Sequence, residues 1–169
     1  MIPTPIRQVL STMRRHQVQS LLMGGQACVF YGAAQFSKDI DLVLLADPLN
    51  FERLHAALAE LKAGRIAVPK FDPAALARGH AVHFRCEAPG VERLRVDIMT
   101  CHRCLPDFSV MWERRTAVAD ESGTVFDIMA VEDLVQAKKT QREKDWPMIS
   151  ALVGAHHHKI GRASCRERV

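Results

Sequence analysis

The chain has 169 residues, of which 48% are hydrophobic and 25% are charged, and its formal net charge is +4. A chain of this length is expected to form one domain that buries about two thirds of its unfolded surface. No apolar run approaches the roughly eighteen residues of a membrane span, and the first residues do not form a signal-peptide core. The sequence therefore argues against a membrane or exported protein and predicts a cytoplasmic one with no membrane partner.

The C-terminal segment Ile160–Val169 reads IGRASCRERV and matches one reading frame of a DNA-sequencing adapter. We expect residues 1–159 to form a single domain, residues 160–169 to be foreign to it, and the natural C-terminus to be missing. Without this segment the 23 basic and 19 acidic side chains become 20 and 18, a net charge of +2. So small an excess gives no argument for a nucleic-acid substrate.

Five cysteines, at positions 28, 86, 101, 104 and 165, form an odd and irregular set. In a chain without an export signal they are expected to be reduced thiols. His80, His83 and Cys86, together with Cys101 and Cys104, offer soft ligands for zinc. Against a zinc site, His80 and His83 point to opposite faces of a strand and there is a single C-x2-C pair.

In the first half of the chain, periodicity and turn residues predict five elements. Thr4-Pro5 is typical of a helix start, and apolar residues follow it at helical spacing. The next elements are a strand, a helix, a strand, and a helix that Asn50 caps and Gly64 ends. The first strand is Val18–Met23, the helix after it is Gln26–Gly32, and the second strand is Asp39–Leu45.

The second half begins with a loop over residues 65–79 that carries a short helical turn. His80–Arg85 and Glu92–Thr100 flank a turn signal and are predicted to form a hairpin. Further along we expect a helix, a strand and two helices: Pro106–Arg115, Thr124–Met129, Val131–Arg142 and Pro147–Val153. These elements predict an α+β protein with a small mixed twisted β-sheet flanked by helices.

Two carboxylates, Asp39 and Asp41, open the apolar run DIDLVLL. Residues i and i+2 of a strand point the same way, with Cα atoms roughly 6 to 7 Å apart. Their oxygens can converge on a hard cation such as magnesium, which also relieves the repulsion between them. The pair therefore predicts a metal-binding strand.

A glycine pair, Gly24-Gly25, follows the apolar residues Leu21-Leu22-Met23 and precedes a short predicted helix. Glycines permit a tight turn, and the free N–H groups of a helix start attract phosphate. Strand, glycine turn, helix and Asp-x-Asp strand is an arrangement that would hold a nucleoside triphosphate while metals bridge its phosphates.

A third carboxylate, Asp97, lies in the alternating run Arg93–Met99, on the face opposite the aliphatic residues. Beside the Asp-x-Asp strand it would complete a two-metal site, in which one metal activates the attacking hydroxyl and the other steadies the leaving pyrophosphate. Asp97 is also a candidate general base.

These three motifs, Gly24-Gly25, Asp39-Ile40-Asp41-Leu42 and Val96-Asp97-Ile98, resemble the signatures of the nucleotidyltransferase superfamily with the DNA polymerase β-like fold. Minimal and AbiEii-type enzymes of toxin–antitoxin systems look nearest. The resemblance implies catalytic and metal-binding roles for the three aspartates, with Mg2+ or Mn2+ as cofactor and a nucleoside triphosphate such as ATP as donor. Relatives often carry an arginine before the Asp-x-Asp, where this chain has Gln35 and Lys38, and Lys38 is a candidate nucleotide-binding cation.

A basic segment near the C-terminus supports this resemblance. Lys138, Arg142 and Asp145 are spaced i, i+4 and i+7, so on one helix they share a face. They resemble the lysine-arginine-aspartate motif of AbiEii-type enzymes, which implies nucleotide binding, with Lys139 an alternative to Lys138. A solvated basic face with i,i+4 ion pairs is the structural alternative.

The acceptor hydroxyl is left open by the sequence. The resemblance admits a tRNA 3′ end, a partner protein such as a cognate toxin or antitoxin, or a small molecule such as an aminoglycoside. Two other functions stay open: a non-catalytic nucleotide- or partner-binding member, and a two-metal hydrolase or glycosyltransferase. Release of pyrophosphate on transfer distinguishes a nucleotidyltransferase from these.

Overall fold

The computed structural model describes residues 3–66, 71–120, 122–139 and 145–154. The segment 160–169, expected to be foreign, and the candidate residue Arg142 lie outside these ranges. Among the described residues, no helix is both long enough and apolar enough to cross a bilayer.

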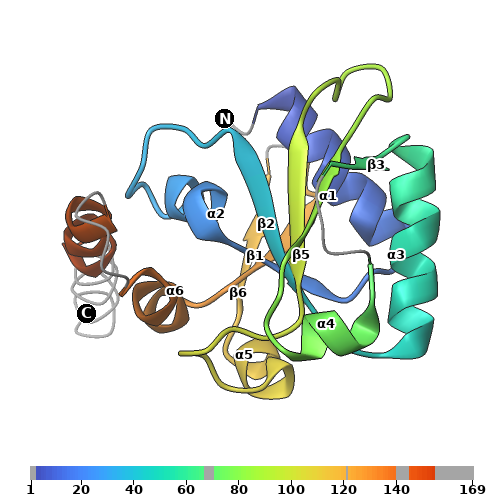
Figure 1. Ribbon diagram of the computed structural model, residues 1–169. Coiled ribbons are helices and arrows are strands. Elements are labelled where there is room, and N and C mark those ends of the chain that lie inside the picture. The colour runs from blue at the N-terminus through green and yellow to red at the C-terminus, as the bar shows by residue number, and fades with distance from the viewer. Residues whose placement is uncertain (1–2, 67–70, 121, 140–144, 155–169) are drawn as a thin grey trace.

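Seven strands form one mixed sheet in the order β3-β4-β5-β2-β1-β7-β6 (Figure 1). Strand β2 lies near its middle, antiparallel to β1 and parallel to β5. Strands β3–β4, β4–β5 and β6–β7 pair antiparallel, and β1 pairs parallel with β7. The strands are β1 Ser20–Met23, β2 Asp39–Leu44, β3 Gly64–Arg65, β4 Val82–Arg85, β5 Arg95–Met99, β6 Thr116–Ala119 and β7 Val125–Ile128.

Helices lie on both sides of the sheet, which confirms the predicted α+β class. In Figure 1, α1 and α3 lie together on one side, and α2 and α6 lie on the other. The helices are α1 Thr4–Arg15, α2 Gly24–Phe30, α3 Pro48–Glu60, α4 Pro73–Ala77, α5 Phe108–Glu113 and α6 Val131–Lys138, and a last one covers residues 146–154.

The central strand β2 shows why the sequence folds in this register. Ile40, Leu42 and Leu44 alternate along it and are almost fully buried. Asp39 and Asp41 fall between them and point to the other face, where both stay partly exposed. Because a slip of one residue would exchange the two sets, burial of the aliphatic side chains fixes which way the carboxylates point.

Some expected element boundaries are wrong. The glycine pair belongs to the first turn of α2, two residues before the expected start at Gln26. Asp47, not Asn50, caps α3, because its side chain accepts a hydrogen bond from the Asn50 amide at 3.1 Å. Gly64 does not end that helix, which stops at Glu60 and leaves Gly64 to begin β3.

The structure adds two strands that the sequence analysis missed, the two-residue β3 and β6. Strand β6 has alternate residues exposed, and it therefore lacks the apolar run by which buried strands are recognised. The predicted helix Pro106–Arg115 before it is shorter, as α5. The hairpin of β4 and β5 and the strand β7 lie within their predicted ranges.

Candidate active site

Strand pairing brings the three predicted carboxylates onto one face of the sheet. In the parallel pair β2–β5, Asp41 lies directly opposite Asp97, and Asp39 lies opposite Arg95. Met23, the residue before the glycine pair, lies opposite Asp41 on the other side of β2. The carboxylates and the glycine turn therefore meet at neighbouring positions, although they are far apart in the sequence.

The glycine pair packs so closely against this group that larger residues do not fit. Gly24 has φ +68°, and a Cβ there would lie 1.9 Å from Oδ2 of Asp41. A Cβ on Gly25 would lie 2.8 Å from Oγ of Ser37. Only glycine lets the chain turn at this distance from a carboxylate.

The electrostatic state of Asp41 reflects this crowding. Burial, followed by the negative charges of Asp97 and Asp39, raises the pKa of Asp41 to about 6, although Lys138 and Arg95 act in the opposite direction. Like charges held together in this way favour a proton or a cation between them. The donor chemistry of the three aspartates therefore fits a hard divalent cation.

Asp97 has two partners that the sequence analysis missed. Arg95 donates from Nε to Oδ1 at 2.7 Å and from its terminal nitrogen to Oδ2 at 2.9 Å. Nδ1 of His83 lies 2.8 Å from Oδ1 of Asp97 and 3.0 Å from the terminal nitrogen of Arg95, so its tautomer decides which contact is a hydrogen bond. The i, i+2 rule that pairs Asp39 with Asp41 would also have identified Arg95 beside Asp97.

In this arrangement the partners of Asp97 are Arg95 and His83, not a second carboxylate. Across residues 3–66, 71–120, 122–139 and 145–154, no three His, Cys, Asp or Glu side chains are grouped closely enough to hold a metal ion as they stand. The histidines and cysteines considered as zinc ligands do not converge either. His83 faces Asp97, whereas Cys86 is fully buried and desolvation raises the pKa of its thiol to about 11.

A pocket of about 500 Å³ opens over this face. It is bordered by the glycine turn, the carboxylates and the segment that follows α6. Its lining residues are Met23, Gly24, Gly25, Ser37, Asp39, Asp41, Arg95, Asp97, Met99, His102, Ala137, Lys138, Asp145 and Met148.

Lys138 and Asp145 both line the pocket, but the expectation that they share one helix is wrong. Helix α6 ends at Lys138, and Lys139 leaves the helical conformation with ψ 64°. Asp145 precedes the helix over residues 146–154, which has Pro147 in its first turn, where a missing N–H costs nothing. Nζ of Lys138 still lies 3.8 Å from Oδ1 of Asp145.

The structure also distinguishes the other candidate cations. The Lys138 side chain is 12% exposed in the pocket, whereas Lys139 is exposed and does not line it. Lys38 is exposed as well and is absent from the pocket lining, although its neighbour Ser37 is part of it. Of the two lysines left interchangeable by the sequence, Lys138 is therefore the one at the site.

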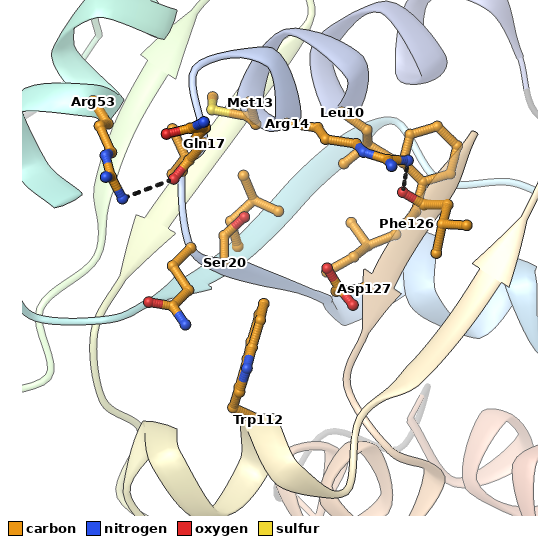
Figure 2. Close-up of a pocket in the computed structure, with 14 residues that line it drawn as sticks. Leu10, Met13, Arg14, Gln17, Ser20, Arg53, Trp112, Phe126 and Asp127 are labelled. Carbon is orange, nitrogen blue, oxygen red and sulfur yellow. Dashed lines mark hydrogen bonds between the residues drawn. The ribbon is translucent and has the colours of Figure 1, made fainter.

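A second cavity, of about 380 Å³, lies beside α1 and α5 (Figure 2). Trp112, Met13 and Leu10 give it apolar walls. Its single carboxylate, Asp127, accepts a hydrogen bond from Nε of Arg115 at 2.7 Å. This cavity has no group of acids comparable with the one between the glycine turn and β5.

At the level of sequence, no protein-family model and no curated protein matches the chain. Solved structures do match it. Lincomycin-bound LnuA, a lincosamide antibiotic adenylyltransferase, superposes with a TM-score of 0.63 at 13% identity, over 92% of this chain and 98% of that one. ANT(2")-Ia in complex with adenylyl-2"-tobramycin gives a TM-score of 0.56 at 14% identity, over 96% and 95% of the two chains.

The solution structure of the antibiotic-resistance factor ANT(2'')-Ia agrees, with a TM-score of 0.55 at 14% identity over 98% of this chain and 91% of that one. At these identities the likeness establishes the architecture. The chain has the fold of these adenylyltransferases, which confirms the predicted nucleotidyltransferase fold.

Proposed function

We propose that the chain is a metal-dependent nucleotidyltransferase that moves a nucleoside monophosphate from a nucleoside triphosphate to a hydroxyl group of a small molecule, with release of pyrophosphate. The observation that carries this proposal is the alignment of Asp39, Asp41 and Asp97 on adjacent strands, facing the glycine turn in one pocket. The choice of a small-molecule acceptor is supported by two structural neighbours whose complexes contain lincomycin and an adenylylated tobramycin.

Asp39, Asp41 and Asp97 are the residues that would hold Mg2+ or Mn2+ in this proposal. When bound, such ions neutralise triphosphate charge and orient the reacting oxygens. The raised pKa of Asp41 supports the assignment, because a carboxylate held among like charges gains most from a nearby cation.

The transfer itself needs a base and a phosphate cradle. The acceptor oxygen forms a bond to the α-phosphorus while the bond from that phosphorus to the bridging β-phosphate oxygen breaks, and the acceptor proton passes to a carboxylate oxygen of Asp97. Gly24 and Gly25 let the triphosphate approach the backbone, and Lys138 supplies a largely buried positive charge beside it.

Calorimetric titration of ATP, CTP, GTP and UTP with magnesium tests the nucleotide site. We expect magnesium-dependent binding of one triphosphate, lost in Asp39→Asn/Asp41→Asn. Asp107→Asn is the matched control, because Asp107 is exposed and makes no side-chain capping bond at the start of α5. A folded wild-type protein that binds no triphosphate would refute the proposal.

A second experiment tests group transfer. The triphosphate that binds is supplied with hydroxylated antibiotics, and pyrophosphate release is measured with and without each acceptor. Phosphate release without an acceptor would instead indicate a hydrolase. A likeness to AbiEii-type enzymes, a cognate toxin or antitoxin, and a role for Arg142 rest on the sequence motifs alone and stay predictions.

A further inference from the structure

Two arginines lie side by side on the face of the sheet that carries the carboxylates. In the antiparallel pair β4–β5, Arg85 is directly opposite Arg95, and His83 is directly opposite Asp97. Arg95 in turn is opposite Asp39 on β2. A row of neighbouring positions therefore runs from Arg85 through Arg95 to Asp39.

This pairing is unfavourable without a counterion. Cβ atoms of directly opposite residues in an antiparallel pair lie about 4.5 to 5.5 Å apart, and like charges in such positions destabilise a sheet. Arg95 is neutralised by Asp97. Arg85 is exposed, and no described residue gives its side chain a hydrogen bond or an ion pair. The guanidinium of Arg85 therefore has free N–H donors, and its planar fork is suited to bidentate hydrogen bonds with an oxyanion.

We propose that Arg85 and Arg95 form an anion subsite that holds a phosphate monoester on the acceptor. A phosphate monoester carries a charge near −2 at neutral pH and is attracted to the guanidinium of Arg85, whereas the charge of the neighbouring Arg95 is already balanced by Asp97. This inference rests on the proposed function and names the chemical class of its acceptor, a phosphorylated hydroxyl compound.

The position of the pair assigns it to the acceptor and not to the donor. The glycine turn follows β1, which flanks β2 on one side, whereas Arg85 lies on β4, two strands from β2 on the other side. At about 4.8 Å per strand, the pair and the glycine turn are separated by roughly 10 to 15 Å. Asp97, the proposed proton acceptor, lies on the strand between Arg85 and β2.

Inorganic phosphate is the probe that tests this subsite directly. Its affinity is measured by calorimetry, and its effect on thermal unfolding is measured in parallel, for wild type, Arg85→Gln, Arg85→Lys and Lys138→Gln. We expect Arg85→Gln to weaken phosphate binding about tenfold and to abolish the phosphate-dependent rise in melting temperature, with Arg85→Lys in between. Without phosphate, Arg85→Gln should melt no lower than wild type, because it removes a like-charge contact.

Arg65→Gln is the matched control. Arg65 is an exposed arginine at the same edge of the sheet, but it pairs with Phe84 and so belongs to the opposite face.

Phosphate affinity that falls only in Lys138→Gln, or falls equally in Arg65→Gln, overturns the subsite. If wild type binds a triphosphate and Arg85→Gln binds phosphate normally, the subsite is refuted and the proposed function stands. If wild type binds no triphosphate but Arg85→Gln loses phosphate, the proposed function fails and the anion site stands.

Discussion

At the scale of single residues, Asp41 shows how a buried carboxylate among other acids costs stability. Its raised pKa means that the folded protein keeps a proton that the unfolded chain releases between about pH 4 and pH 6. Across this window the contribution of Asp41 to the free energy of unfolding falls, and it stays low above about pH 6. The rise from 3.8 to about 6 limits the loss to about 3 kcal/mol, at about 1.4 kcal/mol per pKa unit.

We therefore expect Asp41→Asn to stabilise the protein in EDTA. The gain in unfolding free energy over wild type should be near zero at about pH 4 and reach about 1 to 3 kcal/mol at about pH 7. Urea unfolding at several pH values measures it, and exposed Asp107→Asn should show no such growth. A gain in unfolding free energy that does not change with pH would contradict the raised pKa of Asp41.

Gly24 gives a second prediction at this scale. Alanine there would adopt φ +68° and place its Cβ 1.9 Å from Asp41 Oδ2, so that the strand or the turn must shift. We expect Gly24→Ala to lower the free energy of unfolding by about 2 kcal/mol or more. Gly32→Ala, at φ +75° with no atom within 4 Å of the new Cβ, separates the backbone strain from the clash and should cost about 1 kcal/mol. Equal losses for the two variants would contradict the close approach of the turn.

Residue-scale prediction from sequence succeeded where one rule was sufficient. The i, i+2 alternation placed Asp39 and Asp41 on one face and Asp97 opposite its aliphatic neighbours. It could not show that Asp41 lies opposite Asp97, because register between strands far apart in sequence depends on the packing of both. The same alternation could have placed Arg95 beside Asp97. The position of Arg85 opposite Arg95 could not be predicted, because it depends on the register between β4 and β5.

At the scale of elements, the break after α6 separates two lysines that the sequence could not distinguish. Lys138 ends the helix inside the pocket, and Lys139 leaves the helix toward solvent. We expect Lys138→Gln to weaken triphosphate binding about 10- to 100-fold, the range of one charged hydrogen bond. Lys139→Gln should stay within about twofold of wild type. Calorimetry on both variants measures this, and equal losses would show that general basicity, not position, binds the nucleotide.

The sequence predicted the existence of most elements better than their ends. The helix expected to run on to Arg142 stops at Lys138, because the stop depends on the backbone of Lys139 and on a second helix that begins near Pro147. The cap of α3 was misassigned because Asp47 and Asn50 are both good cap residues, and only the structure shows that the Asn50 side chain bonds the Gln19 and Leu45 carbonyls instead.

At the scale of the whole molecule, the proposed cation should couple the site to global stability. Strands β2 and β5, which carry the three carboxylates, lie in the middle of the sheet, so relief of their repulsion stabilises the fold as a unit. At a magnesium concentration 100 times its dissociation constant, linkage gives about 2.7 kcal/mol, or roughly 5 to 10 °C in melting temperature. Calorimetric melting with magnesium and with EDTA checks this, and Asp39→Asn/Asp41→Asn should not respond. An equal response in that variant would place magnesium elsewhere.

The class of fold was predictable because alternating strands, glycine turns and amphipathic helices followed one another in a recognisable order. The sheet order was not, because the parallel contacts of β2 with β5 and of β1 with β7 join segments separated by long stretches of chain. The edge strand β6 was missed because its residues are exposed or partly exposed and form no apolar run. It is a strand because it pairs with β7, and the sequence of β6 alone does not show that pairing.

The alternation along β2 also bears on how the protein tolerates change over generations. Ile40, Leu42 and Leu44 can drift among other aliphatic residues without turning Asp39 or Asp41, because any apolar set at those positions seeks the same interior. Arg85, exposed near the edge of the sheet, can be exchanged without disturbing that interior. Homologous proteins can therefore keep the carboxylates in place while the residue at position 85, which we propose contacts the acceptor, is exchanged.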